Sequence, residues 1–335
     1  MDRSHSLALN VAALERLWEQ SDLSGRLEEL LMEISKFLKP RAPRLTELSV
    51  KLADANRQIQ FIFYRKRRVM RVSSEADKRA FVSDVGASES FELPTCLPRR
   101  AQYNYDPSVD QLYVYDSNRG FLLVLNLASE VPRVTTVRIG DVGFSSRLSC
   151  CGGKVFICCL LEDGRVSLAM VEIDERRKSS HQLLLWTSER RVTARKLHDF
   201  VASDEVNGVF TFAVMAGYSV VKVRLGGMGH SSSIPREETW SRFPVAALFL
   251  THVLYIRLLT AELMLVVIAS DSTRRSSLVL LEYHNEKWLV GEGDPTLRVA
   301  SPTHLSVGAD LVVHTAHFVQ PEVKMALSAF CCTWE

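Results

Sequence analysis

The sequence lacks the short motifs that mark several enzyme and metal-binding classes. No GxSxG, HExxH or CxxC…CxxC motif occurs, so we predict no catalytic site, no metal site and no cofactor. The 41 Lys and Arg residues nearly balance the 39 Asp and Glu residues, which argues against a general preference for nucleic acid or acidic ligands. The N-terminal stretch has no apolar core of the signal-peptide kind, and the apolar runs are too short to cross a bilayer. We therefore expect no membrane association.

Cysteines are few, and their arrangement does not favour disulfides. There are seven, at positions 96, 150, 151, 158, 159, 331 and 332. Six form adjacent pairs within apolar runs, and neighbouring residues on a strand point to opposite faces, so such a pair does not converge on one metal ion. We expect buried, reduced thiols and a cytoplasmic or nuclear protein.

The N-terminal segment has the spacing of helices. Apolar residues recur three and four positions apart between Leu7 and Leu38, and Pro40 follows that stretch. A further helix is predicted from Leu45 to Ala55. The apolar stripe from Leu27 to Leu38 has two interpretations: it packs on the rest of the chain as a cap, or it docks a partner helix.

From Ile59 onward the apolar pattern changes to alternation. The stretch from Tyr103 to Ile139 shows it best, as four short runs separated by turn residues, among them Asp106-Pro107 and the run from Asp116 to Gly120. Four antiparallel strands in about 45 residues form a meander of the size of one propeller blade.

The same layout recurs six times. Sets of four predicted strands begin near residues 59, 103, 148, 200, 245 and 297, at spacings of 44 to 52 residues. The predicted fold is mainly β, with six four-stranded repeats in a six-bladed β-propeller-like domain at 57–335, preceded by a short α-helical N-terminal segment at 1–56. A two-sheet sandwich or two smaller β domains remain alternatives.

Three local patterns suggest sites, and each also has a structural explanation. The segment from Gly226 to His230 lacks the phosphate-loop signature and is expected to be a surface loop. His314 and His317 are three apart in a predicted strand and therefore face opposite sides. The basic run from Arg65 to Arg68, near Tyr103 and Tyr105, has the composition of a nucleic-acid patch, but a solvated hairpin tip is the expected structure, so nucleic-acid binding is unlikely.

Two segments resemble parts of F-box proteins that carry a C-terminal β-rich domain. Residues 28–38, EELLMEISKFL, are similar to the first F-box helix, and residues 103–114, YNYDPSVDQLYV, are similar to the opening of the β domain that follows the F-box in many such proteins. The resemblance implies that Leu30, Leu31, Ile34 and Phe37 contact a Skp1-like adaptor. It also implies that the β domain holds a degradation target.

These patterns predict a non-catalytic protein that binds other proteins. The most specific version is an F-box-like substrate receptor of a ubiquitin ligase. One alternative is a scaffold subunit of a larger assembly, docked through the Leu27 to Leu38 stripe. Another is a metal-dependent six-bladed hydrolase or lactonase, which requires acidic or Asn side chains that converge on a cation.

Overall fold

In a computed structural model the chain forms two units, Met1–Ala42 with Trp334–Glu335, and Pro43–Thr333. The structure describes residues 43–54, 58–66, 68–74, 79–84, 90–93, 101–129, 132–140, 145–174, 177–205, 209–226, 236–242, 253–269, 275–284, 287–290, 296–300, 304–307, 312–319 and 324–334. The helices predicted between Leu7 and Leu38, with the adaptor residues Leu30, Leu31, Ile34 and Phe37, lie outside these ranges. Over the described ranges every regular element is a strand, and no helix able to span a membrane is found there.

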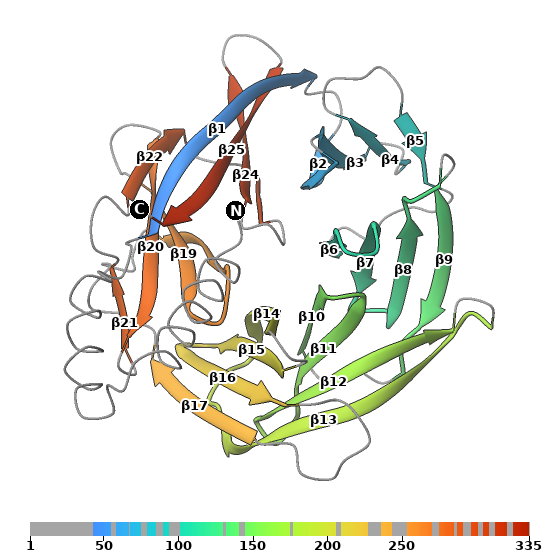
Figure 1. The fold of residues 1–335 in the computed structure, drawn as a ribbon, viewed down its shortest axis with the longest axis vertical. Helices are drawn as coiled ribbons and strands as arrows, with labels where there is room; N and C mark the ends of the chain where they lie inside the picture. Colours follow the sequence, from blue (N-terminus) through green and yellow to red (C-terminus); the bar gives the residue numbers. More distant parts are fainter. Residues whose placement is uncertain are drawn as a thin grey trace, which may run out of the picture. The chain divides into compact units, whose positions relative to one another are not determined.

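The strands form six sheets, drawn in Figure 1. The first three sheets contain β2 (Gln58–Arg65), β3 (Arg68–Ser74), β4 (Ala80–Asp84) and β5 (Ser90–Glu92); β6 (Gln102–Asp106), β7 (Gln111–Asp116), β8 (Phe121–Asn126) and β9 (Arg133–Arg138); and β10 (Ser145–Cys151), β11 (Lys154–Leu160), β12 (Arg165–Asp174) and β13 (Ser179–Arg191). The fourth contains β14 (Leu197–Glu205), β15 (Val209–Ala216), β16 (Ser219–Leu225) and β17 (Arg236–Arg242). In these four sheets each strand pairs antiparallel with the next along the chain.

The fifth sheet differs from the predicted pattern. It contains β18 (Val253–Leu258), β19 (Leu263–Ala269), β20 (Arg275–His284) and β21 (Lys287–Val290), and β22 (Thr296–Ala300) pairs with the other half of β20. Residues 281–284 of β20 face β21 and residues 275–279 face β22, so its outer position is filled by two short strands. The prediction of four strands per sheet is confirmed for five sheets and is wrong for this one.

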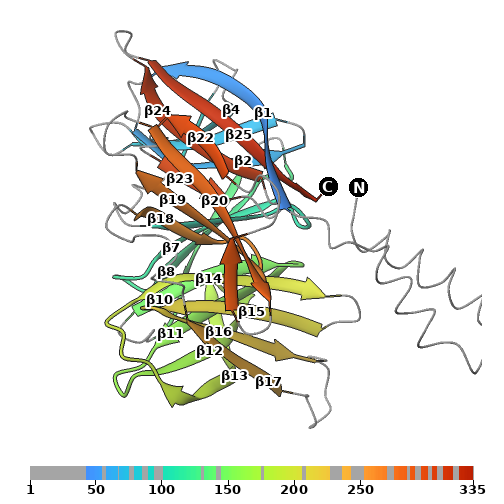
Figure 2. The same cartoon turned by 90° about the vertical axis from the view of Figure 1, so that its left-hand side faces the viewer.

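The sixth sheet combines the first described strand with the last three. Its order is β1 (Pro43–Asp54), β25 (Lys324–Trp334), β24 (Val312–Val319) and β23 (His304–Val307). Figure 2 shows β1 and β25 side by side. The helix predicted from Leu45 to Ala55 is therefore wrong, because pairing with a strand some 270 residues later in the chain overrides the local helical spacing. The segment from Leu297 to Ala300, predicted to open this sheet, belongs to the fifth.

Apolar side chains fill the space between consecutive sheets. One cluster joins the third and fourth sheets, where the ring of Phe156 lies 5.4 Å from that of Phe210 and 4.9 Å from that of Phe212. Adjacent residues serve different clusters, as expected for strands: Cys158 belongs to this cluster and Cys159 to the one between the second and third sheets. Both cysteines are buried and free, in agreement with the prediction of reduced, apolar thiols.

The innermost strands are joined by side chains that bond the backbone of the next sheet. Asn104 Nδ2 of β6 donates to the carbonyl of Leu148 on β10 at 2.8 Å. Ser149 Oγ of β10 accepts the amide of Ala202 on β14 at 3.0 Å. An edge strand leaves backbone groups unpaired, and these bonds satisfy some of them. Meanders of four strands, packed face to face and joined in this way, make the described domain a β-propeller.

Candidate functional site

A polar cluster lies where the third, fourth and fifth sheets meet. Asp199 of β14 accepts the amide of Leu258 at Oδ2 (2.7 Å), and its Oδ1 lies 3.7 Å from Nη1 of Arg257. Burial raises the pKa of the Asp199 carboxyl, and Arg257 opposes that shift. Arg147 of β10 donates from Nε to the carbonyl of His198 at 3.3 Å. These contacts attach β18 and β10 to β14, which is a structural role.

Two turn carboxylates of the described residues, Asp106 and Asp163, also have structural partners. Asp106 accepts the amide of Ser108 at 2.9 Å and, across to the third sheet, the amide of Gly153 at 2.8 Å. Asp163 accepts the amide of Arg165 at 3.0 Å. Within the ranges that the structure describes, no group of three or more His, Cys, Asp or Glu side chains is placed to hold a metal ion. The side chains of His314 and His317 lie outside the described set, although their backbone belongs to β24.

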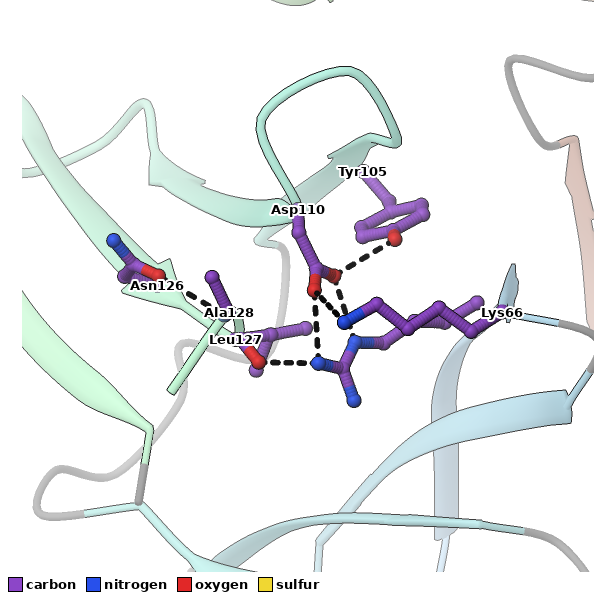
Figure 3. A network of polar contacts seen from close by, with 7 residues as sticks. Lys66, Tyr105, Asp110, Asn126, Leu127 and Ala128 are labelled. Carbon is purple, nitrogen blue, oxygen red and sulfur yellow. Dashed lines mark hydrogen bonds and ion pairs between the residues drawn. The ribbon is translucent and has the colours of Figure 1, made fainter. Parts of the chain in front are cut away.

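Asp110 joins the first and second sheets through a charged network (Figure 3). Arg65 donates from Nε to Asp110 Oδ1 at 2.7 Å and from Nη2 to Oδ2 at 2.8 Å, and Nη2 also bonds the carbonyl of Leu127. Lys66 Nζ lies 3.2 Å from Asp110 Oδ2, and the Tyr105 hydroxyl donates to Oδ1 at 2.9 Å. The bonds from Arg65 hold the pKa of Asp110 down at about 2.

This network corrects the expectation of a solvated tip for Arg65, whose side chain is 22% exposed and pairs with Asp110. Lys66 and Arg68 agree with the expectation, since their side chains are 68% and 74% exposed, although each also lies near a carboxylate. The neighbouring rings are also engaged, since Tyr103 stacks on Phe61 at 5.5 Å. These rings are therefore not presented for base stacking. Arg67, Arg99 and Arg100 lie outside the described residues, as does the loop from Gly227 to Ser233.

The outermost strand of the third sheet carries the most exposed leucines of the described residues. On β13, Leu183 is 45% exposed and Leu184 is 64% exposed. Tyr218 is also 64% exposed, but it lies in the turn between β15 and β16 and not on a strand. The leucines lie at the centre of a strand that is last in the order β10-β11-β12-β13, so no described strand pairs with its outer edge. We call Leu183, Leu184 and the strand that carries them the β13 edge surface.

The two leucines point to opposite sides of the sheet. Leu183 pairs with Met170, which packs on the cluster between the third and fourth sheets, whereas Leu184 pairs with Ala169, which belongs to the cluster between the second and third. The register shifts after Leu184, because Trp186 pairs with Leu168 and leaves Leu185 as an extra residue. Both faces of the outer edge are therefore apolar at this point.

The chain beyond the leucines is anchored to the fourth sheet. Trp186 Nε1 donates to Glu238 Oε2 at 3.2 Å, and the guanidinium of Arg190 lies 6.0 Å above the ring of Trp240. At the other end, Ser180 Oγ donates to the carbonyl of Arg138 at 2.8 Å, which ties β13 to the second sheet. The β13 edge surface is thus held at both ends, and between them it pairs with no other strand in the described part of the chain.

Sequence reasoning missed this surface. Leu183 to Leu185 lie within the third predicted set of strands, but three consecutive leucines do not alternate, so nothing in the pattern marks two of them as exposed. The signal available was the run itself, because an unbroken apolar run on the last strand of a meander has no neighbouring strand to cover its outer edge.

Comparisons with known proteins do not assign the chain to a family. No family model matches the sequence, and no curated protein matches it. Among solved structures, the chain is similar to the β-propeller domain of Cps50 (Swd1) from Myceliophteria thermophila, with 10% identity, a TM-score of 0.44, and coverage of 81% of this chain and 83% of that one. It is similar to the WD40 domain of SCAP from fission yeast (10%, TM-score 0.41, 86% and 90%) and to streptogramin B lyase (11%, TM-score 0.42, 87% and 98%). The description of the fold above rests on the sheet topology of this chain.

Proposed function

We propose that this protein is a non-catalytic protein-binding module that uses the β13 edge surface to hold a protein partner. The observation that carries the proposal is the exposure of Leu183 and Leu184 at the centre of an outermost strand. Exposed apolar side chains on a free strand edge favour association with another chain. Among the described residues, the carboxylates of Asp106, Asp163 and Asp199 bond to backbone amides, and that of Asp110 bonds to Arg65.

A finer version of the proposal is an F-box-like substrate receptor in the cytoplasm or nucleus. In this version Leu30, Leu31, Ile34 and Phe37 bind a Skp1-like adaptor, and the propeller binds the protein to be modified. Its support is the sequence resemblance of residues 28–38 and 103–114. The same proposal counts six blades. The fifth sheet is one of them, although two short strands, β21 and β22, share its outer position.

The test is affinity purification from the native source with four versions of the full chain. Leu184→Asp tests the edge surface, Phe37→Asp tests the adaptor helix, and Tyr218→Asp is the matched control, because Tyr218 and Leu184 are equally exposed. We expect a partner that is recovered with the unmodified chain and with Tyr218→Asp but is lost with Leu184→Asp. Partners that all three variants retain would contradict the proposed use of β13.

The binding of an adaptor is assessed separately, with the Phe37→Asp variant. Loss of a Skp1-like protein with Phe37→Asp alone supports the receptor version. A fixed set of other subunits that depends on Phe37 supports the scaffold alternative instead. A stoichiometric divalent ion in the purified protein would favour the hydrolase alternative and contradict the non-catalytic proposal.

A further inference from the structure

We propose that the partner segment held by the β13 edge surface is an extended peptide with acidic ends, which adds to the sheet as a further strand beside β13. This inference rests on the proposed function and specifies the partner of the same surface. In strand addition, backbone hydrogen bonds supply affinity and side-chain contacts supply specificity. The edge strand must therefore be long and unpaired on its outer side, and its side chains must complement those of the peptide.

The length of β13 favours strand addition there over the other outer strands of consecutive meanders. It has 13 residues, compared with 3 in β5, 6 in β9 and 7 in β17. From Ser179 to Leu184 its register with β12 is continuous, and two register shifts follow, one after Leu184 and one between Thr187 and Arg191. Six regular residues match the usual length of a paired strand. Beyond the bulge β13 stays paired with β12 at Trp186, Thr187 and Arg191, so the outer edge continues to the basic end of the strand.

The exposure of leucines on both faces distinguishes an added strand from other occupants. A helix or a flat protein surface laid against one face of the sheet covers Leu183 or Leu184, but not both, because they point to opposite sides. A strand paired along the outer edge places alternate side chains on each face, so it covers both leucines at once. The geometry therefore favours an extended segment with apolar side chains at adjacent positions.

The charges along β13 indicate the ends of that segment. Residues 178–191 carry three exposed basic side chains, Lys178, Arg190 and Arg191, against one exposed acidic side chain, Glu189. The basic residues lie at the two ends and the leucines between them. Arg177, just before this stretch, is 3.5 Å from Asp174 and adds no net charge. An apolar peptide with Asp or Glu at each end complements this arrangement.

The same charges disfavour a second copy of this chain as the occupant. Two β13 strands paired antiparallel bring Lys178 of one copy near Arg190 and Arg191 of the other. Like charges at directly opposed positions destabilise a strand pair. An acidic peptide avoids this repulsion, so the proposal commits to a different chain as the partner.

The first test is selection of binders from a library of random peptides of about twelve residues, presented to the full chain. We expect the selected peptides to have β-branched or apolar residues at their centre, acidic residues at their ends and no central proline. Leu183→Asp and Leu184→Asp should each weaken binding of a selected peptide about tenfold or more, because each removes apolar burial on one face. Tyr218→Asp should leave the affinity unchanged.

The prediction of acidic peptide ends is tested with one variant and a matched control variant. Arg191→Glu should weaken binding of an acidic-ended peptide several-fold and strengthen binding of the same peptide with Lys at its ends. Arg119→Glu, at an exposed turn of the second sheet, should do neither. Equal effects of the two variants would overturn the acidic assignment.

Backbone pairing is tested by amide hydrogen exchange and by N-methylated peptides. An added strand should slow exchange of alternate amides between Ser179 and Leu184, and N-methylation of alternate peptide residues should abolish binding while methylation of the intervening residues is tolerated. Binding that depends on Leu184 but leaves these amides unprotected would refute strand addition while leaving the proposed function intact. If the selected peptides ignore both leucines, or if the chain dimerises in a manner that Leu184→Asp abolishes, the peptide assignment is wrong. If Leu184→Asp keeps every native partner, the proposed function itself fails.

Discussion

Replacing Asp110 with Asn removes one charge from the network between the first and second sheets while preserving the local backbone. Asp110 has a φ of 54°, a left-handed conformation that Asn adopts about as readily as Asp. The amide nitrogen of Asn would face the N–H groups of Arg65, which now donate to Asp110 at 2.7 and 2.8 Å. Any loss of stability therefore reports the ion pair and not strain in the turn.

The expected loss follows from the pKa. The Asp110 side chain is only 13% exposed, and its pKa falls from 3.8 to about 2 in the folded protein. At about 1.4 kcal/mol per pKa unit, this corresponds to roughly 2 kcal/mol of stability at neutral pH. Because the folded pKa lies below the unfolded value, the contribution is complete above about pH 5 and is lost as the pH falls toward 2. At pH 3 it is reduced to about half.

The assay is denaturant unfolding of the full chain and of Asp110→Asn at pH 7 and at two acidic values. We expect the free energies of unfolding to differ by about 2 kcal/mol at pH 7 and to converge as the pH falls. Asp174→Asn is the control, since Asp174 pairs with Arg177 at 3.5 Å but the two side chains are 44% and 85% exposed. That variant should lose less than about 0.5 kcal/mol. A difference for Asp110→Asn that is no larger than the control, or that does not change with pH, would refute the reasoning.

Three further changes test other parts of the fold. Gly120→Ala should lower the free energy of unfolding by about 1–3 kcal/mol in thermal unfolding, because Gly120 has a φ of 65° and a Cβ there would lie 2.9 Å from the carbonyl oxygen of Ile139. Gly140→Ala is the control and should be near neutral, because a Cβ there meets no such contact. Phe156→Ala should cost about 3–5 kcal/mol, since the ring is fully buried against two rings of the fourth sheet, and a smaller loss would contradict the packing described. Burial raises the pKa of Cys158 well above its usual value, so iodoacetamide near pH 8 should label it only after unfolding, and labelling of the folded chain at the rate of a free thiol would count against its burial.

Local pattern predicted the strands well wherever a strand pairs with its neighbour in sequence. The hairpin of β6 and β7, with Asp106 opposite Gln111, was readable from alternation and from Asp106-Pro107. The same information failed at β1, whose leucine spacing is that of a helix and whose partner β25 lies at the far end of the domain. It failed again at β22, because nothing local tells whether a short strand continues one sheet or begins the next.

The candidate surface was less predictable than the fold. Exposure of Leu184 depends on its place at the outer edge of the sheet and on the bulge at Leu185, and both are properties of the pairing with β12. The pairing of Arg65 with Asp110 likewise joins residues 45 positions apart. A basic run beside turn aspartates can be seen in the sequence, but the partners cannot be assigned until the sheets are adjacent.

The pairing of β1 with β25 also has a consequence for synthesis of the chain. Residue 324 is made 270 residues after Asp54, and at about 5–20 residues per second the ribosome needs on the order of tens of seconds to cover that distance. During this time the consecutive meanders of β2 to β17 can fold one after another, while β1 waits for its partner. We predict that nascent chains arrested before residue 312 leave the β1 segment open to protease, and that chains extended past residue 334 protect it. The last sheet is therefore completed only when translation is nearly finished, and the rate of translation sets how long β1 stays without its partner strand.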